Sequence, residues 1–272
     1  MNTTAVQRWR EHRASYRPAG EPFNPRRFDV ALFDEDRVAR DFVAAHHYLG
    51  SLPPTRFRAG LYEAGALVGV AAFTVPQRDA VLAPYPRATA VELGRFVLLD
   101  QVRANAESWF LARAFELLRP EGIEGVVSFS DPLRRVAVDG TVRCRGHVGT
   151  VYAATNAIYV GPTRPETVRL LPDGRDLGLR ALAKIRAKDT GWRYAVDALL
   201  AQGAPAPTST SREALAAWVD RVVPRLTRRV RHPGKHKYFL PLKRTGAGCR
   251  AIVRALEARA VPYPKVIAPC SS

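Results

Sequence analysis

The stretch from 91 to 132 constrains the fold more than any other part of the chain. It begins with an apolar, β-branched run over 91–99, which predicts a strand, and continues through a polar loop over 100–105. Large apolar side chains then recur at helical spacing over 106–118, and a second strand-like run follows at 125–132. Strand, loop, helix and strand predict one βαβ unit. Its loop presents free N–H groups at a helix N-terminus, where a phosphate binds favourably.

The loop Gln101–Ala106 resembles the pyrophosphate loop of the GNAT acetyltransferases, which reads Gln/Arg-x-x-Gly-x-Gly/Ala. Ala104 stands where that family usually has glycine, and a methyl group there crowds a phosphate and restricts the backbone. The resemblance implies an acetyl-CoA site, and the alternative that this turn only connects two elements stays open. The residues implied in cofactor binding are Phe96, Val97, Leu98, Gln101, Arg103, Ala104, Asn105, Ala106, Glu107 and Ser108.

Length and composition are those of a soluble globular protein. The 272 residues, 47% hydrophobic and 25% charged, are enough for one large domain or two small ones. No apolar run is long enough to span a bilayer, and residues 1–27 lack the apolar core of a signal peptide. The 3 cysteines have no metal-ligand spacing and make an odd number, which predicts a reducing, cytoplasmic setting.

The charge balance indicates a polyanionic partner. Lys and Arg number 42 against 25 acidic residues, a net charge of +17, and arginine binds phosphate with two parallel hydrogen bonds. A GC-rich genome would explain arginine in place of lysine, although it would not explain the surplus of positive charge. Residues 221–244 contain no acid and form the most basic segment, for which a merely solvated face is the alternative.

The first part of the chain predicts the order of elements of a GNAT fold. Residues 1–27 form a basic arm, with a helix expected over Val6–Arg13. A strand follows at 28–33, and Asp34 is expected to cap a helix that ends near Ala45. Two runs at 56–63 and 66–75 predict a hairpin that leads to the βαβ unit. The fold class is therefore α/β (α+β): a mixed central sheet with flanking helices and a basic helical C-terminal extension.

The remaining residues predict an insertion and a return to the sheet. A glycine-containing loop at 146–149 leads into a short helix, and strands are expected at 157–161 and 166–171. Helices are expected at 177–188, 192–202 and 212–223, followed by a late strand over Tyr238–Leu242 at the edge of the sheet. The expected domains are the arm at 1–27, a catalytic domain at 28–242 with a helical insertion at about 177–223 and the basic segment 221–244, and a tail at 243–272.

Several polar side chains stand where chemistry is expected. His47 and Tyr48 follow a helix, and Arg95 lies in an apolar strand, where it must find an anion or a carboxylate. Ser130 and Asp131 end the second strand of the βαβ unit, at the edge where open α/β sheets bind ligands. Each has a structural alternative: a core or surface histidine, a capping aspartate or, for Tyr152, a core tyrosine.

Six short motifs resemble, in order, the Mom family of phage DNA-modification proteins, over about 28–242. They are His47-Tyr48, Glu92-Leu93-x-Arg95-Phe96, Ser108-Trp109-Phe110-Leu111, Ser128-Phe129-Ser130-Asp131-Pro132, Gly146-His147-Val148-Gly149-Thr150-Val151-Tyr152-Ala153-Ala154 and Lys235-His236-Lys237-Tyr238. The resemblance implies a GNAT-like enzyme linked to acetyl-CoA that converts adenine in DNA to an N6-carbamoylmethyl (acetamido) form and protects phage DNA from restriction. Double-stranded DNA is then the partner, and the paired adenine is expected to be flipped out of the helix.

The resemblance also implies roles for the candidate residues. Tyr48 and His47 would stack on the flipped base, Asp131 would hold or deprotonate the N6 amine, and Tyr152 would act as an acid. Ser130 and Arg95 would orient the acyl group or the base. The cationic residues expected at DNA phosphates are Arg56, Arg228, Arg229, Arg231, Lys235 and Lys237. Acetyl transfer alone would give N6-acetyladenine, whereas a carbamoylmethyl product needs a bond to the methyl carbon, for which a metal or another cofactor is a candidate.

Two other functions stay open. The first is a GNAT N-acyltransferase acting on a protein or small-molecule amine without DNA. The second is a non-catalytic DNA-binding module built on the same fold, whose DNA binding would survive the loss of Asp131 and Tyr152.

Overall fold

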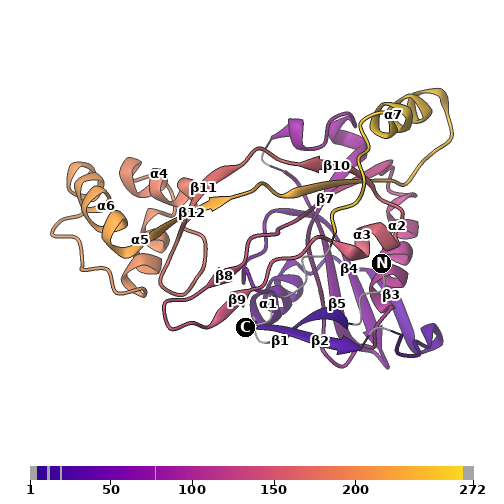
Figure 1. Cartoon of the computed structure of the whole chain (residues 1–272), viewed down its shortest axis with the longest axis horizontal. Helices are drawn as coiled ribbons and strands as arrows, with labels where there is room; N and C mark the ends of the chain where they lie inside the picture. Colours follow the sequence, from indigo (N-terminus) through magenta and orange to yellow (C-terminus); the bar gives the residue numbers. More distant parts are fainter. Residues whose placement is uncertain (1–4, 11–12, 19, 77, 266–272) are drawn as a thin grey trace. The chain divides into compact units, whose positions relative to one another are not determined.

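A computed structural model describes residues 5–10, 13–18, 20–76 and 78–265 (Figure 1). The chain divides into two compact units. One, here called the sheet unit, comprises Met1–Pro132, Gly146–Thr163 and Lys235–Ser272, and the other, here called the helical unit, comprises Leu133–Arg145 and Arg164–Gly234. In the sequence, the helical unit is therefore inserted into the sheet unit at two places.

The sheet unit contains a seven-stranded mixed sheet with the order β10-β13-β7-β6-β5-β4-β3. Strands β6 and β7 are parallel, and all other neighbours in this sheet are antiparallel. The mixed α/β class and the central βαβ unit expected from the sequence are confirmed. The strands are β3 (Phe28–Leu32), β4 (Thr55–Glu63), β5 (Ala66–Thr74), β6 (Ala90–Leu98), β7 (Gly125–Ser130), β10 (Ile158–Pro162) and β13 (His236–Pro241).

The sequence predicted the late strand at the edge of the sheet, and this prediction was wrong. Strand β13 lies between β7 and β10, with Tyr238 opposite Ser128 on one side and opposite Tyr159 on the other. Tyr238 and Phe239 point to opposite faces and both have no exposed surface. A strand that is apolar on both faces is stabilised by an interior position, where both faces are covered.

Helices cover both faces of the sheet. The helices of the sheet unit are α1 (Asp36–His46), α2 (Ala106–Leu118), α3 (Thr150–Ala154) and α7 (Ala247–Glu257), with single turns at η1 (Pro25–Arg27), η2 (Asp79–Val81) and η3 (Arg87–Thr89). Val126 and Tyr238 pack in the core beneath α2, whereas Val127 and Phe239 pack on the opposite face with Leu256 of α7. This alternation is the period-two pattern of a sheet buried on both sides.

Two local predictions were wrong. The N-cap of α1 is Glu35 rather than Asp34, and Asp36 instead forms ion pairs with Arg58 and Arg40. The described residues of the expected helix Val6–Arg13 are not helical. Strands β1 (Ala5–Arg10) and β2 (Arg13–Pro18) pair as an antiparallel hairpin in its place. Tertiary contacts override the weak helical preference of this segment, because Arg8 is buried against the loop that precedes α2.

The helical unit has a core of its own. The expected helices are present as α4 (Leu179–Ala187), α5 (Trp192–Leu200) and α6 (Arg212–Leu226), and they pack around buried residues such as Ile185, Leu199 and Trp218. The basic run at 228–232 is itself strand β12 (Arg228–His232), paired with β11 (Glu166–Leu170), and a second small ribbon joins β8 (Arg135–Val136) to β9 (Val142–Cys144). Within the described ranges, no helix is long and apolar enough to cross a membrane.

Candidate active site

The two parallel strands of the sheet unit part at their carboxyl ends. Residue pairing between β6 and β7 runs from Ala90 and Gly125 to Leu93 and Ser128 and then stops. Strand β6 continues to Leu98, paired only with β5, and β7 continues to Ser130, paired only with β13. Backbone groups beyond Leu93 on this side are therefore available to a ligand at the edge where α/β sheets bind one.

A bulge in β6 lies at the start of this opening. The register between β5 and β6 shifts between the pairs Ala72–Arg95 and Phe73–Leu93, so Gly94 has no counterpart on β5. A Cβ atom at Gly94 would lie 2.5 Å from Oγ1 of Thr74, which accounts for the glycine. Bulges change the direction of side chains and backbone groups next to active sites, and this one adjoins both Leu93 and Arg95.

Glu92 is the functional candidate that the sequence analysis missed. It precedes the bulge and lies on the face opposite Leu93. Burial raises the pKa of its carboxyl, while the positive charges of Lys235, Arg95 and Lys237 act in the opposite direction. Within the described part of the chain its side chain forms no ion pair. A half-buried carboxyl without an ion-pair partner at the opening between β6 and β7 can take up and release a proton. An acidic residue in the same apolar run as Arg95 was the available sequence signal.

Of the two kinds of partner expected for Arg95, an anion or a carboxylate, no carboxylate of the described residues is hydrogen-bonded to it. Its Nε donates a hydrogen bond to the carbonyl of Ser51 at 2.7 Å, and Nη1 donates to the carbonyl of Gly94 at 2.6 Å. Burial lowers the pKa of the guanidinium, and the charges of Tyr48 and Glu92 oppose that shift. Backbone carbonyls can satisfy a partly buried guanidinium, so in this structure Arg95 holds the loop after α1 against the bulge.

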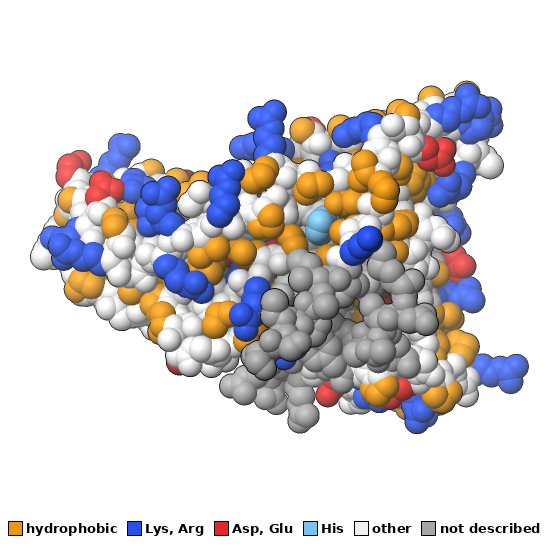
Figure 2. All heavy atoms as spheres, in the orientation of Figure 1, with side chains coloured by type: hydrophobic (Ala, Val, Ile, Leu, Met, Phe, Trp, Pro, Cys, Tyr) orange, Lys and Arg blue, Asp and Glu red, His pale blue; other side chains and the backbone are white. Residues whose placement is uncertain are grey.

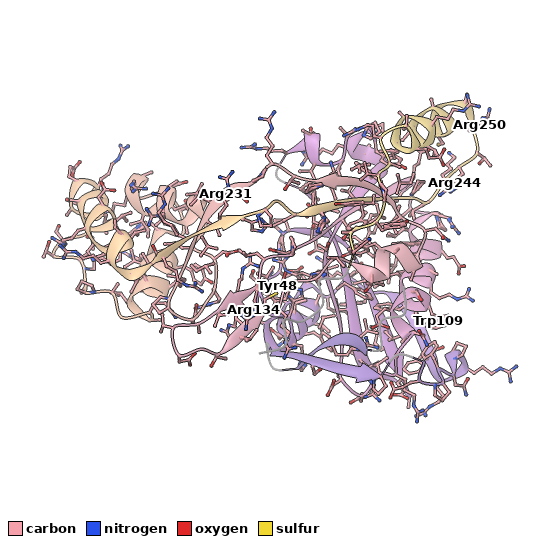
Figure 3. The ribbon with its side chains drawn as sticks, viewed as in Figure 1. Tyr48, Trp109, Arg134, Arg231, Arg244 and Arg250 are labelled. Carbon is pink, nitrogen blue, oxygen red and sulfur yellow. The ribbon has the colours of Figure 1, made fainter. Side chains whose placement is uncertain are left out.

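His47 and Tyr48 lie where α1 ends and are both buried. Tyr48 is labelled in Figure 3. Their rings stack on each other with centroids 4.5 Å apart, and Nδ1 of His47 accepts the N–H of Leu49 at 3.1 Å. His46 instead contacts Phe42, so the two histidines point in different directions. Tyr48 acts electrostatically on the guanidinium of Arg95, so the stacked pair lies near Arg95.

Three tyrosines and a histidine form a cluster on the other face. The ring of Tyr238 lies 4.9 Å from that of Tyr152 and 5.0 Å from that of Tyr159, between centroids. The Tyr159 hydroxyl is 2.6 Å from Nδ1 of His236, and the Tyr238 hydroxyl donates to the carbonyl of Val148. Burial raises the pKa of Tyr152 to about 12, with the hydroxyl of Ser128 acting in the opposite direction and the charge of Glu92 reinforcing the shift. Tyr152 is therefore a protonated donor at neutral pH.

Asp131 and Ser130 lie beside this cluster. Ser130 is fully buried and is paired in the sheet with His236, while Asp131 is 7% exposed and accepts the N–H of His147 at its main-chain carbonyl. Burial lowers the pKa of His236, and the charge of Asp131 opposes this. Strand β13 thus places His236 next to Ser130 and Asp131, and places Tyr238 against Tyr152.

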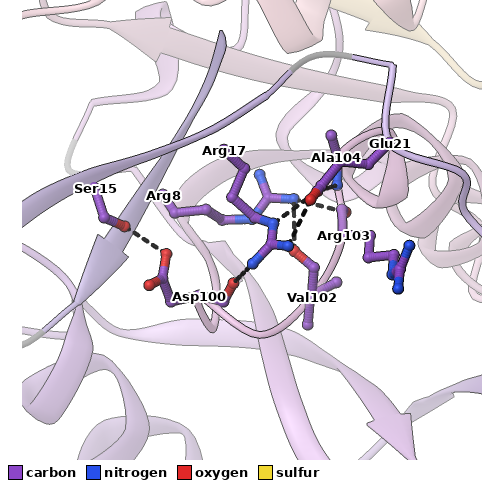
Figure 4. A network of polar contacts seen from close by, with 8 residues as sticks. All are labelled: Arg8, Ser15, Arg17, Glu21, Asp100, Val102, Arg103 and Ala104. Carbon is purple, nitrogen blue, oxygen red and sulfur yellow. Dashed lines mark hydrogen bonds and ion pairs between the residues drawn. The ribbon is translucent and has the colours of Figure 1, made fainter.

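The loop expected to hold a pyrophosphate joins β6 to α2 (Figure 4). Gln101, Arg103 and Asn105 are exposed, and Asn105 adopts a left-handed conformation with φ of 71°. The residue with the left-handed conformation is therefore Asn105 and not Ala104, and asparagine tolerates that conformation. The other residues expected at a cofactor are mostly in the interior: Phe96 packs on Phe110, Ser108 is half-buried, Glu107 is paired with Arg8, and Val97, Leu98, Ala104 and Ala106 are buried.

The residues expected at DNA belong to both units. Arg56, Lys235 and Lys237 are in the sheet unit, and Arg228, Arg229 and Arg231 are in the helical unit. Arg229 and Arg231 are exposed on β12 (Figure 3), whereas Nη2 of Arg228 donates to the carbonyl of Val136 at 2.6 Å. Arg56 is exposed and donates to the carbonyl of Ala88.

Lys237 is less accessible than the other cations. It lies over the rings of Phe129 and Phe239, and burial lowers the pKa of its ammonium group. Lys and Arg side chains are spread over the visible face, with few acidic ones among them (Figure 2). Among the described residues, no group of three or more His, Cys, Asp or Glu side chains could hold a metal ion.

Comparison with known proteins identifies one family and several solved structures of low sequence identity. Residues 27–265 match the Mom protein family. No curated protein matches the chain. Similar solved structures include an aminoglycoside 6'-N-acetyltransferase from Enterococcus faecium, with 14% identity over 50% of this chain and 88% of that chain and a TM-score of 0.35. A tandem GNAT protein from the clavulanic acid biosynthesis pathway has 10% identity over 80% and 100%, with a TM-score of 0.41. An N-acetyltransferase from Staphylococcus aureus Mu50 has 7% identity over 79% and 97%, with a TM-score of 0.34.

Proposed function

Because this chain belongs to the Mom protein family, we propose that it modifies DNA, converting adenine to an N6-carbamoylmethyl form with a two-carbon unit from an acetyl-CoA-type donor. Such a modification would protect phage DNA from restriction. The observation that carries the proposal is the half-buried carboxyl of Glu92 at the opening between β6 and β7. The adenine base and the acyl donor would bind at this opening, and the basic surfaces would bind the DNA backbone.

The adenine amine is a weak nucleophile and needs a hydrogen-bond acceptor. Joining N6 to the methyl carbon of the donor replaces one N–H and one C–H bond and so needs a two-electron oxidant, and an ammonia-type donor must displace the CoA thiol to form the terminal amide. The N6 amine loses one proton in this bond formation, and a carboxylate next to the amine can take it. Glu92 suits this role because its raised pKa makes it a stronger base than an exposed glutamate. Asp131, on the other side of the opening and next to His236, is the second carboxylate in reach of a base held there.

Other residues position the reactants. Tyr152 is protonated at neutral pH and can donate a hydrogen bond to a developing negative charge. Arg95 and Tyr48 lie on the face of Glu92, so a flipped base entering from that face would meet the Tyr48 ring. Burial raises the pKa of the Tyr238 hydroxyl, and the nearby Ser130 side chain acts in the opposite direction. The loop that Tyr238 holds through Val148 leads into α3 and so fixes Tyr152.

The residues at the loop before α2 fit an anionic cofactor. The N–H of Ala104 already donates to a carboxylate, that of Glu21, so this donor accommodates an anion. A bound acyl-CoA thioester would supply the two-carbon unit and place its diphosphate at this N–H. The backbone of β6 beyond Leu93, on the side that no longer pairs with β7, would hold the arm between the diphosphate and the reacting carbon.

The basic surfaces supply affinity that does not depend on sequence. The exposed arginines of β12 and the exposed Arg56 and Lys235 can bind DNA phosphates without contacting bases. A flipped adenine costs a few kcal/mol of stacking and pairing, which such contacts offset.

The test is mass spectrometry of nucleosides from DNA co-expressed with the protein. Wild-type protein is expected to yield a modified adenine, and the mass of the added group separates carbamoylmethyl from acetyl. Glu92→Gln is expected to reduce the yield by about 10²-fold, as for the loss of a general base. Glu116→Gln, an exposed change on α2, is the control and should leave the yield unchanged. Unmodified DNA together with acylation of free amines would overturn the proposal in favour of an ordinary amine acyltransferase.

A further inference from the structure

The segment that precedes β3, which contains β1, β2 and Glu21, forms hydrogen bonds with the loop that joins β6 to α2 (Figure 4). Arg8 donates to the carbonyls of Val102 and Arg103 at 3.3 and 2.9 Å and forms an ion pair with Glu107. Arg8 is only 2% exposed, and its contacts, together with the hydrogen bonds of Ser15 and Arg17 to Asp100, fasten the hairpin of β1 and β2 to the loop. They occupy the carbonyl groups of the loop and leave its N–H groups to other partners.

The N–H of Ala104 is bound by a carboxylate from the same segment. Oε2 of Glu21 accepts this N–H at 3.0 Å. The guanidinium of Arg17 donates to both oxygens of Glu21, at 2.7 and 2.6 Å, and to the carbonyl of Asp100 at 2.5 Å. A main-chain N–H next to a helix N-terminus and a guanidinium with two parallel donors are also the groups that bind a phosphate.

The carboxyl group of Glu21 is ionised. The hydrogen bond from Arg17, and then that from the Ala104 N–H, lower the pKa of its carboxyl to about 2. The group at the loop is therefore an anion across the physiological pH range. The side chains of Arg17 and Glu21 are 25% and 18% exposed, so solvent, and with it a soluble ligand, can reach the pair.

We propose that the Ala104 N–H and the Arg17 guanidinium form a diphosphate-binding site, and that Glu21 occupies it as an internal anion that an incoming diphosphate displaces. The identification of the natural ligand as the diphosphate of an acyl-CoA rests on the proposed function. The site itself needs only the donors and the exchange of one anion for another. Arg17 then becomes a cofactor-binding residue that lies outside the pyrophosphate loop.

The experiment is calorimetric titration of inorganic pyrophosphate at fixed ionic strength. Glu21→Gln removes the competing charge and keeps the shape of the side chain, so pyrophosphate should bind about tenfold more tightly than to wild type. Arg17→Gln removes the two parallel donors and should weaken binding about tenfold. In wild-type protein, the amide resonance of Ala104 should shift as pyrophosphate is added, a measurement that needs no substitution.

The controls use a second ion pair of the sheet unit. Arg27 and Glu63 are 2.8 Å apart and neither contacts the loop. Glu63→Gln and Arg27→Gln change the net charge by the same amounts as the two test variants, so their pyrophosphate affinity should equal that of wild type. Thermal unfolding of all four variants shows whether each is folded.

The outcomes separate this site from the proposed function. An unchanged or lower pyrophosphate affinity of Glu21→Gln, or an Ala104 resonance that stays in place at saturation, overturns the site and makes Glu21 a structural contact. Coenzyme A is titrated separately. If pyrophosphate responds as expected and no variant binds coenzyme A, the site stands and the acyl-CoA donor is overturned. If coenzyme A binds to wild type and to both variants with the same affinity, the acyl-CoA donor stands and the site is overturned.

Discussion

The Ser128 hydroxyl donates a hydrogen bond to the Leu93 carbonyl at 3.3 Å, at the last residue pair that joins β6 to β7. Both groups are buried, and the bond ties the two strands together where their pairing ends. The Ser128 hydroxyl also acts on the pKa of Tyr152. The Ser128 side chain thus joins the two strands at the start of the opening and lies close enough to Tyr152 to affect its pKa.

Glu92→Gln is expected to stabilise the protein near pH 7. Burial raises the pKa of this carboxyl above its value in the unfolded chain, so its contribution to stability is complete below the unfolded pKa and is lost as pH rises through the folded pKa. Glutamine stays neutral, so the Tm of the variant should exceed that of wild type near neutral pH. The difference should vanish toward about pH 4. A variant with a lower Tm near neutral pH would show that the ionised carboxylate is stabilised by its basic neighbours.

Asp131→Asn is expected to leave the fold intact and to reduce adenine modification by about 10²-fold or more, as for removal of a general base. Its main-chain carbonyl, which accepts the His147 N–H, is unaffected by the substitution. Nucleoside mass spectrometry measures the modification, and a DNA-binding assay should give an unchanged affinity. The exposed Asp41→Asn is the control. Unfolding of Asp131→Asn would make Asp131 structural, and near-normal modification would exclude it from the reaction.

Tyr152→Phe is expected to lower the modification rate by about 10²-fold, the size expected for a missing proton donor. Because burial raises the pKa of Tyr152 to about 12, its titration should not appear in a rate profile below about pH 10. Tyr263→Phe, which removes a hydroxyl bonded to the Ala157 carbonyl in the same unit, is the control. Equal losses in the two variants would indicate that both act through packing alone.

Charge reversal at Arg229 and Arg231 is expected to weaken DNA binding and flatten its salt dependence. Each lost phosphate contact should reduce the slope of log K against log salt by about one unit. Both side chains are exposed, and Arg229 lies directly opposite Arg169 on β11, so the fold is expected to tolerate the change. Each single reversal is compared with Arg26→Glu, an exposed reversal in the sheet unit that makes the same change in net charge. An unchanged slope would show that β12 is a solvated face.

Local patterns predicted much of the sheet unit. The strand at 91–99, the helix at 106–118 and the hairpin at 56–75 lie within one or two residues of β6, α2, β4 and β5. Each of these elements is recognised by a periodicity that repeats over neighbouring residues, and that periodicity survives folding because one face of each is buried. The prediction of a helix over Val6–Arg13 was wrong because this segment pairs as a hairpin whose Arg8 is buried against residues far along the chain.

The sequence by itself determined the βαβ unit, the chain order around it and the candidacy of Ser130, Asp131 and Tyr152, since these follow from spacing along the chain. Only the tertiary structure placed β13 inside the sheet, which brings His236 beside Asp131 and brings Lys235 and Lys237 toward Glu92. It also brought Glu21 to the Ala104 N–H. The physical reason is that strand partners and buried charges are selected by long-range packing, on which a local periodicity carries no information.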